Sequence, residues 1–282
     1  MPSERIVDSH VHFFDPALLH YDWLDSVPAI KRRSLPADVD TGGYRVDGFV
    51  VVENDARTGE AVAEVRWLAG LCRDDPRVAG IVARVDLEDA EASRATLDAF
   101  SGIGAVVGVR RLLQDAPAGF TDLVAFRAGM AALSESRLPF DTCVRHWQLG
   151  DVDRLAADFP DVTFVLDHVG KPDIRAGLAE PWRSDIASLA KRPNVFCKLS
   201  GLTTEADHES WTEEQIRPYL LHAIDAFGPS RCMYGSDWPV VTLATTYGRW
   251  LELVLDVVSD LSTAERGSVL STTAAAVYGL DR

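Results

Sequence analysis

The chain has 282 residues, and its 28 Lys and Arg against 43 Asp and Glu give a formal net charge of −15. This excess of negative charge opposes binding to the phosphate backbone of nucleic acids or to an anionic membrane surface. Hydrophobic residues make up 47 % and charged residues 25 %, which is typical of a globular protein rather than a disordered chain. No apolar run reaches the roughly 18–20 residues of a membrane span, and the first residues do not resemble a secretory leader. We therefore expect a cytoplasmic protein that binds neither nucleic acid nor membrane.

Short apolar segments rich in β-branched residues recur along the chain and predict eight strands. Several of them are continuously apolar, as is typical of parallel strands buried on both faces. The predicted strands are Arg5–Ser9, Gly48–Glu53, Val78–Val85, Ala105–Arg110, Pro139–Val144, Thr163–Asp167, Val195–Leu199 and Arg231–Gly235.

Segments of helical period lie between these strands, and two more follow the last one. The predicted helices are Thr58–Arg73, Glu88–Phe100, Thr121–Ser136, Gly150–Asp158, Pro181–Lys191, Thr212–Phe227, Tyr247–Ser259 and Ser262–Tyr278. No Gly-, Ser- or Pro-rich linker divides the chain. Eight strand–helix steps without a seam predict one α/β domain over 1–282, a (β/α)8 TIM barrel with extra C-terminal helices. We expect the long segment 13–43, which shows no clear helix, to cover the barrel mouth as a lid.

Polar residues follow three of the predicted strands, where a barrel of this kind places its active site. His10 and His12 stand two apart in a strand, so both side chains face the mouth. His168 follows the sixth strand and Asp237 follows the eighth. Imidazole and carboxylate groups that converge in this way can bind a divalent metal such as zinc, and a carboxylate can act as general base toward water.

Motifs along nearly the whole chain resemble the amidohydrolase superfamily, within it the "amidohydrolase 2" branch of sugar-lactone and 2-pyrone-4,6-dicarboxylate lactonases. The matching segments are 8–16 (DSHVHFFDP), 21–24 (YDWL), 108–111 (GVRR), 138–141 (LPFD), 167–172 (DHVGKP), 198–201 (KLSG) and 235–240 (GSDWPV). The resemblance implies a distorted (β/α)8 barrel and a hydrolase that opens a small sugar- or acid-derived lactone.

The resemblance also implies roles for these polar residues. Asp237 would be the general acid/base, with His168 beside it, and His10, His12, His168 and Asp237 would surround the hydrolytic water and one divalent metal. Strand four ends in arginines, which cannot supply the bridging group of a binuclear centre, so the implied site is mononuclear and holds zinc. Glu53 is a further candidate ligand. Some related lactonases work without metal, so a metal-free reaction stays open.

Cationic and aromatic residues near other predicted strand ends suggest how a small-molecule substrate binds. Arg110, Arg145, His146 and Lys198 would gather positive charge, which suits carboxylates or vicinal hydroxyls. Because side chains alternate along a strand, only one of Arg110 and Arg111 can face inward, and we favour Arg110. Trp23 and Trp238 are candidates for stacking on a sugar ring, and Asp167 is a candidate for orienting a neighbouring group.

Two other functions are consistent with the same four residues. One is a zinc-dependent non-oxidative decarboxylase of an aromatic or unsaturated carboxylic acid, although segments 21–24 and 198–201 look more like the lactonase branch. The other is a non-catalytic ligand-binding barrel, which would be free to lose the quartet that this chain retains. The sequence pattern gives no oligomeric state.

Overall fold

Residues 4–280 are described by a computed structural model, and the ends of the expected 1–282 domain, 1–3 and 281–282, lie outside the described residues. The described residues contain eight parallel strands that pair in chain order, and all eight predicted strands are confirmed. The first begins two residues later than predicted. The strands are β1 (Val7–Val11), β2 (Gly48–Val52), β3 (Val78–Arg84), β4 (Val106–Leu112), β5 (Phe140–Cys143), β6 (Phe164–Leu166), β7 (Val195–Leu199) and β8 (Cys232–Tyr234).

The sheet closes on itself between the first strand and the segment after the last. Val11 forms a parallel bridge with Trp238, and the His12 N–H donates to the Trp238 carbonyl at 2.7 Å. The Asp237 N–H donates to the carbonyl of His10 at 2.8 Å. These contacts join the chain segments that carry His10, His12 and Asp237.

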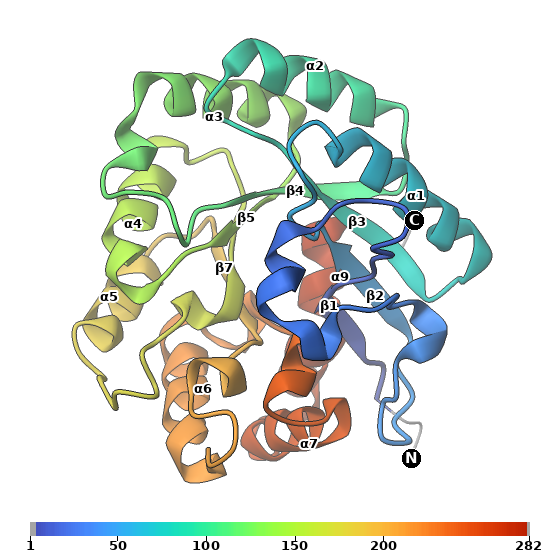
Figure 1. Cartoon of the computed structure of the whole chain (residues 1–282). Helices are drawn as coiled ribbons and strands as arrows, with labels where there is room; N and C mark the ends of the chain where they lie inside the picture. The colour runs from blue at the N-terminus through green and yellow to red at the C-terminus, as the bar shows by residue number, and fades with distance from the viewer. Residues whose placement is uncertain (1–3, 281–282) are drawn as a thin grey trace.

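Helices surround the strand ring, with the connections between strands and helices at its two ends (Figure 1). They are α1 (Ala61–Asp74), α2 (Ala90–Ser101), α3 (Val124–Ser136), α4 (Leu149–Asp158), α5 (Trp182–Leu189), α6 (Glu213–Phe227), α7 (Tyr247–Val257), α8 (Thr263–Gly267) and α9 (Thr273–Tyr278). The last predicted helix, Ser262–Tyr278, is divided, because a π-helical turn at Ser268–Thr272 separates α8 from α9. Among the described residues no helix combines the length and apolar character needed to cross a membrane.

Strand alternation separates two apolar clusters. Phe49 and Val51 of β2 belong to the large cluster between strands and helices. Val50 and Val52 face the opposite way and join a smaller cluster inside the barrel, which includes Tyr278 of α9. Because successive residues of a strand point to opposite faces, a continuously apolar strand can serve both layers.

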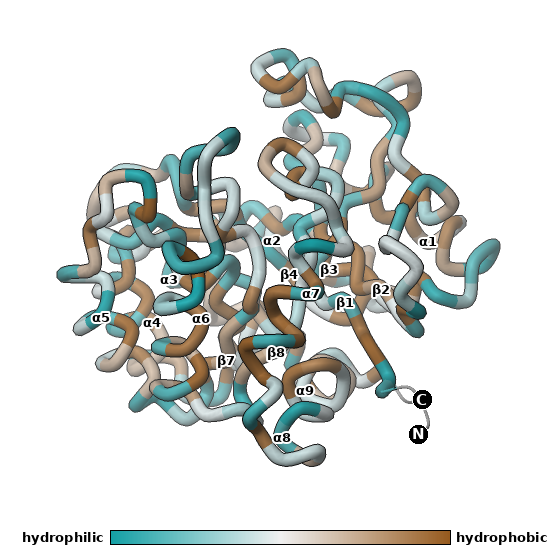
Figure 2. The backbone as a smooth tube through the Cα atoms, turned by 90° about the horizontal axis from the view of Figure 1, so that it is seen from below, coloured by the Kyte–Doolittle hydropathy of each residue, from teal (hydrophilic) through white to brown (hydrophobic). Residues whose placement is uncertain are grey.

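Helix α9 closes one end of the barrel. It lies behind the centre of the strand ring in Figure 1, and the view in Figure 2 places α8 and α9 below the strands. Its residues Ala274 and Tyr278 pack inside with valines from β1, β2, β3 and β6. At the opposite end, where the strands finish, lie the loops that carry His12, His168 and Asp237.

The segment 13–43 contains three short 3₁₀-helices, at Asp22–Ser26, Pro28–Ile30 and Pro36–Asp38, where the sequence indicated no helix. Phe14, Tyr21, Leu24 and Ile30 form an apolar cluster of their own with Ala56 of the next loop. The Trp23 indole N–H donates to the Asn54 carbonyl at 2.7 Å. The segment is therefore packed on the loop after β2, and its function as a lid stays a prediction.

Candidate active site

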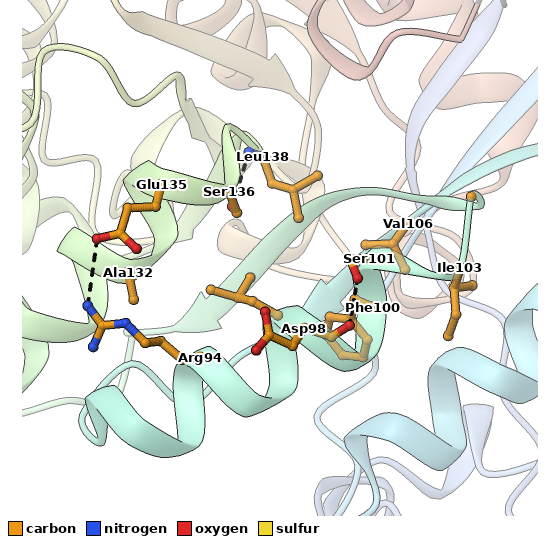
Figure 3. Close-up of a pocket in the computed structure, with 12 residues that line it drawn as sticks. Arg94, Asp98, Phe100, Ser101, Ile103, Val106, Ala132, Glu135, Ser136 and Leu138 are labelled. Carbon is orange, nitrogen blue, oxygen red and sulfur yellow. Dashed lines mark hydrogen bonds and ion pairs between the residues drawn. The ribbon is translucent and has the colours of Figure 1, made fainter.

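Two hollows of the structure differ in the side chains that lie at them. One of about 450 Å³ lies between α2 and α3 on the outside of the barrel (Figure 3). A second, of about 300 Å³, lies at the carboxyl ends of the strands, and the groups of closely spaced His, Cys and Asp side chains found among the described residues lie in or beside it. It is lined by His12, Trp23, Val27, Asn54, Asp55, Arg110, Leu112, Gln114, Asp115, Cys143, His168, Lys171, Asp237, Val240 and Leu243. We call this second hollow the active-site pocket.

His10 and His12 come together at the end of β1 as the two-residue spacing predicts. Both are buried, and their Nε2 atoms lie 3.2 Å apart. Nδ1 of His12 lies 3.1 Å from the carbonyl oxygen of Val52, which can only accept, so this nitrogen carries the proton. This places Nε2 of His12 toward His10 and Asp237, where it can bind a proton or a metal.

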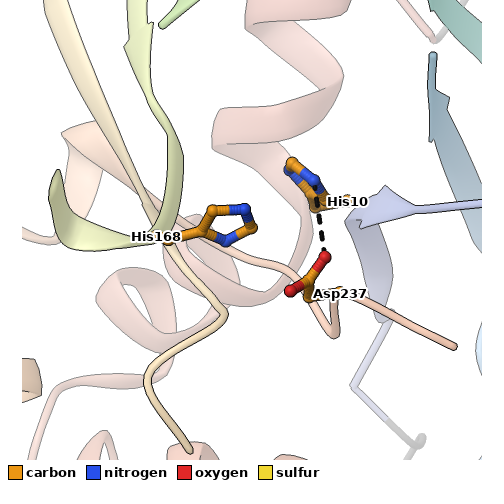
Figure 4. A group of neighbouring side chains, drawn as sticks. All are labelled: His10, His168 and Asp237. Atoms are coloured by element: carbon orange, nitrogen blue, oxygen red, sulfur yellow. Dashed lines mark ion pairs between the residues drawn. The ribbon is translucent and has the colours of Figure 1, made fainter. Parts of the chain in front are cut away.

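Asp237 and His168 meet this pair from β8 and β6 (Figure 4). Oδ1 of Asp237 lies 3.4 Å from Nε2 of His12 and 3.7 Å from Nε2 of His10. The rings of His10 and His168 have centroids 4.5 Å apart, and Nδ1 of His168 is 2.9 Å from the Ser200 hydroxyl. The four predicted residues thus form one cluster.

The backbone is left-handed at two residues of this cluster. His168 has φ 53° and Asp237 has φ 62°, a region that costs side-chain-bearing residues energy. Lys171, which also faces the pocket, has φ 47°. Unfavourable conformations of this kind concentrate at functional sites, where the surrounding structure holds a side chain in a required position.

The donor set fits one divalent metal. Ligand atoms of His10, His168 and Asp237 all lie within 4.8 Å of one another, and a mixed imidazole and carboxylate set suits zinc. A second group of equal spacing joins Cys143, Asp167 and His168. Burial raises the pKa of the Cys143 thiol to about 12, which disfavours the thiolate that a metal would need. The first group is therefore the better candidate.

Burial and charge set the protonation of the cluster. Burial lowers the pKa of His10 and of His168 well below the usual value, so both are neutral at pH 7. Burial also acts to raise the pKa of Asp237, but its neighbours, the Lys171 ammonium among them, outweigh it and hold that pKa below its usual value. An ionised carboxylate beside neutral imidazoles is suited to accept a proton from water.

Arg110 faces inward as predicted, and two carboxylates bind it. Its Nε donates to Glu53 Oε1 at 2.7 Å, and its Nη1 lies 3.4 Å from Asp167 Oδ2. The other Glu53 oxygen accepts the Asp55 N–H at 2.6 Å. Glu53, a candidate metal ligand, is therefore ion-paired with Arg110. It belongs to neither of the two groups of described side chains that could hold a metal ion. Arg111 points outward and pairs with Glu88 at 2.7 Å.

Lys198 lies beneath the pocket rather than in its wall. It is fully buried, and its Nζ lies 3.2 Å from Nδ1 of His10 and 3.1 Å from Oδ1 of Asp167. It also contacts the carboxylate of Asp141. Asp167 Oδ1 is 3.2 Å from Nδ1 of His10, which agrees with its predicted part in orienting a neighbour. Lys198 is not among the described residues that line the pocket, and its expected contact with substrate stays a prediction.

Three other residues that were predicted to contact substrate are not among the described residues that line the pocket, namely Arg145, His146 and Trp238. Arg145 pairs with the rim residue Asp115 at 3.3 Å, and His146 packs edge-on against the exposed Trp147. Trp238 is 5 % exposed and packs on Phe13, and its stacking on a sugar stays a prediction. Trp23 does line the pocket.

The sequence reasoning missed several pocket residues. Lys171 and Cys143 line the pocket, and Asn54, Asp55, Gln114 and Asp115 add polar groups from the loops after β2 and β4. Lys171 stands three residues after His168, so the motif that revealed His168 already contained it. The loop residues carry no spacing signal, because loops of irregular conformation determine where they point.

The fold and the cluster define a (β/α)8-barrel enzyme with a His/Asp site at the carboxyl ends of its strands. A family model described as "Amidohydrolase" matches residues 7–280, and the chain belongs to the amidohydrolase family. The expected family and fold are thus confirmed.

Similar proteins agree with this assignment. The chain is 34 % identical over 294 residues to an L-fucono-1,5-lactonase of Burkholderia multivorans, covering 97 % of this chain and 96 % of that one. It is 34 % identical over 253 residues to an L-fucono-1,5-lactonase of Burkholderia ambifaria, covering 87 % and 85 %. A crystal structure of a Burkholderia multivorans amidohydrolase with bound zinc superposes with a TM-score of 0.87 at 34 % identity, covering 98 % and 99 %.

Proposed function

We propose that the chain is a lactonase that opens a neutral, polyhydroxylated sugar lactone, with Asp237 as general acid/base. The observation that carries the proposal is the position of Asp237, whose carboxylate borders the active-site pocket and contacts His12. The two Burkholderia relatives named as L-fucono-1,5-lactonases support the reaction type.

The proposed reaction uses the chain's own groups in sequence. Asp237 accepts a proton from water, and the water oxygen attacks the lactone carbonyl. Arg110 contributes positive charge to the pocket wall where the oxyanion forms. The bond from the carbonyl carbon to the ring oxygen then breaks, and Asp237 returns the proton to that oxygen. The product acid releases a proton to solvent at neutral pH.

We propose that one zinc ion is held by His10, His168 and Asp237, with His12 beside it. Such an ion, when bound, lowers the pKa of a coordinated water. Asp167 holds the His10 ring in the orientation that this requires, and the Ser200 hydroxyl does the same for His168.

The charge of the pocket favours a neutral substrate over a dicarboxylate. Among the described lining residues, the cations Arg110 and Lys171 face the carboxylates Asp55, Asp115 and Asp237. Both cations are ion-paired, Arg110 with Glu53 and Lys171 with Glu205 at 2.8 Å. Carboxylates and amides accept hydrogen bonds from sugar hydroxyls, whereas a substrate carboxylate would have to displace an existing ion pair.

A pH-indicator screen tests the proposal. The panel holds neutral aldonolactones, including L-fucono-1,5-lactone, a dicarboxylate lactone, and aromatic carboxylic acids monitored for carbon dioxide. We expect proton release that is fastest with a neutral aldonolactone. Turnover of the dicarboxylate alone would contradict the substrate class, and carbon dioxide release without proton release would establish the decarboxylase instead. Zinc analysis before and after chelation, with the rate measured on each sample, tests the metal.

A further inference from the structure

Helix α9 places a tyrosine hydroxyl next to the buried charged residues that lie beneath the active-site pocket. Tyr278, the last residue of α9, is 3 % exposed, and its hydroxyl lies 2.9 Å from both Oδ1 and Oδ2 of Asp141 on β5. Its ring packs among the valines inside the barrel. A Cβ on Gly108 of β4 would lie 3.2 Å from Cε1 of this ring, so the glycine leaves the space that the ring occupies.

Asp141 connects this hydroxyl to the active site through one lysine. The Lys198 ammonium contacts Asp141, Oδ1 of Asp167 at 3.1 Å and Nδ1 of His10 at 3.2 Å. Oδ1 of Asp167 also lies 3.2 Å from Nδ1 of His10, so the carboxylate that pairs with Lys198 is the one that orients this ring. A continuous chain of contacts therefore runs from Tyr278 through Asp141 and Lys198 to His10.

The Tyr278 hydroxyl is not needed to fill the space inside the barrel. A phenylalanine would fill the same apolar space, whereas a buried hydroxyl costs free energy unless it is hydrogen-bonded. By donating to Asp141, Tyr278 fixes the carboxylate against which the Lys198 ammonium is held. Without the hydroxyl, Asp141 has one partner fewer, and Lys198 is free to shift away from His10.

We propose that Tyr278 is a positioning residue, which acts through Asp141 and Lys198 to hold the His10 ring in its reactive orientation. The proposal rests on the proposed function, because it assigns the effect to the lactonase reaction. It makes the docking of α9 at the closed end of the barrel a condition for full activity at the open end.

The test is Tyr278→Phe, with Tyr219→Phe as its matched control. Tyr219 is a buried tyrosine of α6 that packs on Trp182 on the outer side of the barrel, with ring centroids 4.9 Å apart. We expect Tyr278→Phe to lower kcat roughly 10- to 100-fold, as partners behind an active-site histidine do. We expect KM to stay within about twofold in that variant. A loss confined to kcat indicates an interaction that is made only in the transition state. The control keeps both constants.

A double-mutant cycle shows whether the effect passes through Asp141. In an Asp141→Asn background, Tyr278→Phe should cause no further loss of kcat, because the charge that holds Lys198 is already gone. A full-size loss in that background, or unchanged kcat in the single variant, would overturn the proposal. If Tyr278→Phe does not fold, Asp141→Asn alone must lower kcat, and retained kcat overturns it equally.

A spectroscopic measurement separates this proposal from the proposed function. The ring-nitrogen chemical shifts of His10 in ¹⁵N-labelled protein should move in Tyr278→Phe and stay in place in Tyr219→Phe. A wild-type protein that opens no lactone would refute the proposed function, while the His10 shifts would still decide whether Tyr278 positions the ring. Unmoved His10 shifts in Tyr278→Phe would refute the positioning.

Discussion

Asp237 and His10 are joined twice, once through the backbone and once through their side chains. The Asp237 N–H donates to the His10 carbonyl at 2.8 Å, and its Oδ1 lies 3.7 Å from His10 Nε2. The first contact helps to close the barrel between its first and last strands, and the second belongs to the proposed catalytic cluster. The segment that closes the barrel after its last strand therefore also carries a residue of the site.

Replacing Asp237 with Asn should abolish most lactone hydrolysis. Loss of a general base costs roughly 10²- to 10⁴-fold in kcat. Asn has the same shape and tolerates the left-handed backbone at this position, where φ is 62°. The thermal midpoint and circular dichroism spectrum should therefore stay close to those of the wild type. Turnover near the wild-type rate would contradict the acid/base role.

Glu205→Gln should make the pocket accept acidic lactones better. The Glu205 carboxylate pairs with Lys171 at 2.8 Å, and removing its charge frees the ammonium for a substrate carboxylate. At the ~1 kcal/mol scale of partly exposed ion pairs, KM for an acidic lactone should fall roughly fivefold. KM for a neutral lactone serves as the control and should hold steady. An equal change for both substrates would mean that Lys171 does not sense substrate charge.

Lys198→Met should destabilise the protein far more than a surface lysine does. The variant leaves Asp141 buried without its cation and Asp167 with Arg110 alone, which costs about 3–5 kcal/mol in unfolding free energy. Lys31→Met is the control, because Lys31 pairs with Asp25 at the surface, where ion pairs contribute about 1 kcal/mol or less. Urea unfolding of both variants compares them. Equal losses would show that the buried network contributes no more than the surface pair.

Glu64→Gln should stabilise the protein at pH 8 and leave it unchanged near pH 4. Glu64 is fully buried in α1, and burial, with Glu53 nearby, raises its pKa from 4.5 to about 7. The folded state keeps this proton between about pH 4.5 and 7 while the unfolded state releases it, so stability falls as pH rises through that range.

The gain from Glu64→Gln at pH 8 should be roughly 1–3 kcal/mol, because each pKa unit corresponds to about 1.4 kcal/mol. Asn54 donates its side-chain N–H to Oε1 of Glu64 at 2.8 Å, a bond that Gln can also accept. The exposed Glu135→Gln should show no such pH-dependent gain. A stability difference between Glu64→Gln and wild type that does not vary with pH would contradict the raised pKa.

The sequence by itself determined the barrel and the cluster at its mouth. Eight β-branched apolar runs predict parallel strands because such strands are buried on both faces, and the carboxyl ends of parallel strands meet at one end of a barrel. His10, His12, His168 and Asp237 could be placed together for that reason, without knowledge of any contact between them.

The tertiary structure decided which charges the pocket offers. Arg110, Arg145 and Lys198 follow or lie in strands that end at the pocket, yet Arg110 is bound by Glu53, Arg145 pairs at the rim and Lys198 lies underneath. Tyr278 reaches Asp141 from 137 positions further along the chain. Periodicity shows which face a side chain occupies, but the free or paired state of a charge depends on partners that only the folded chain brings within hydrogen-bonding distance.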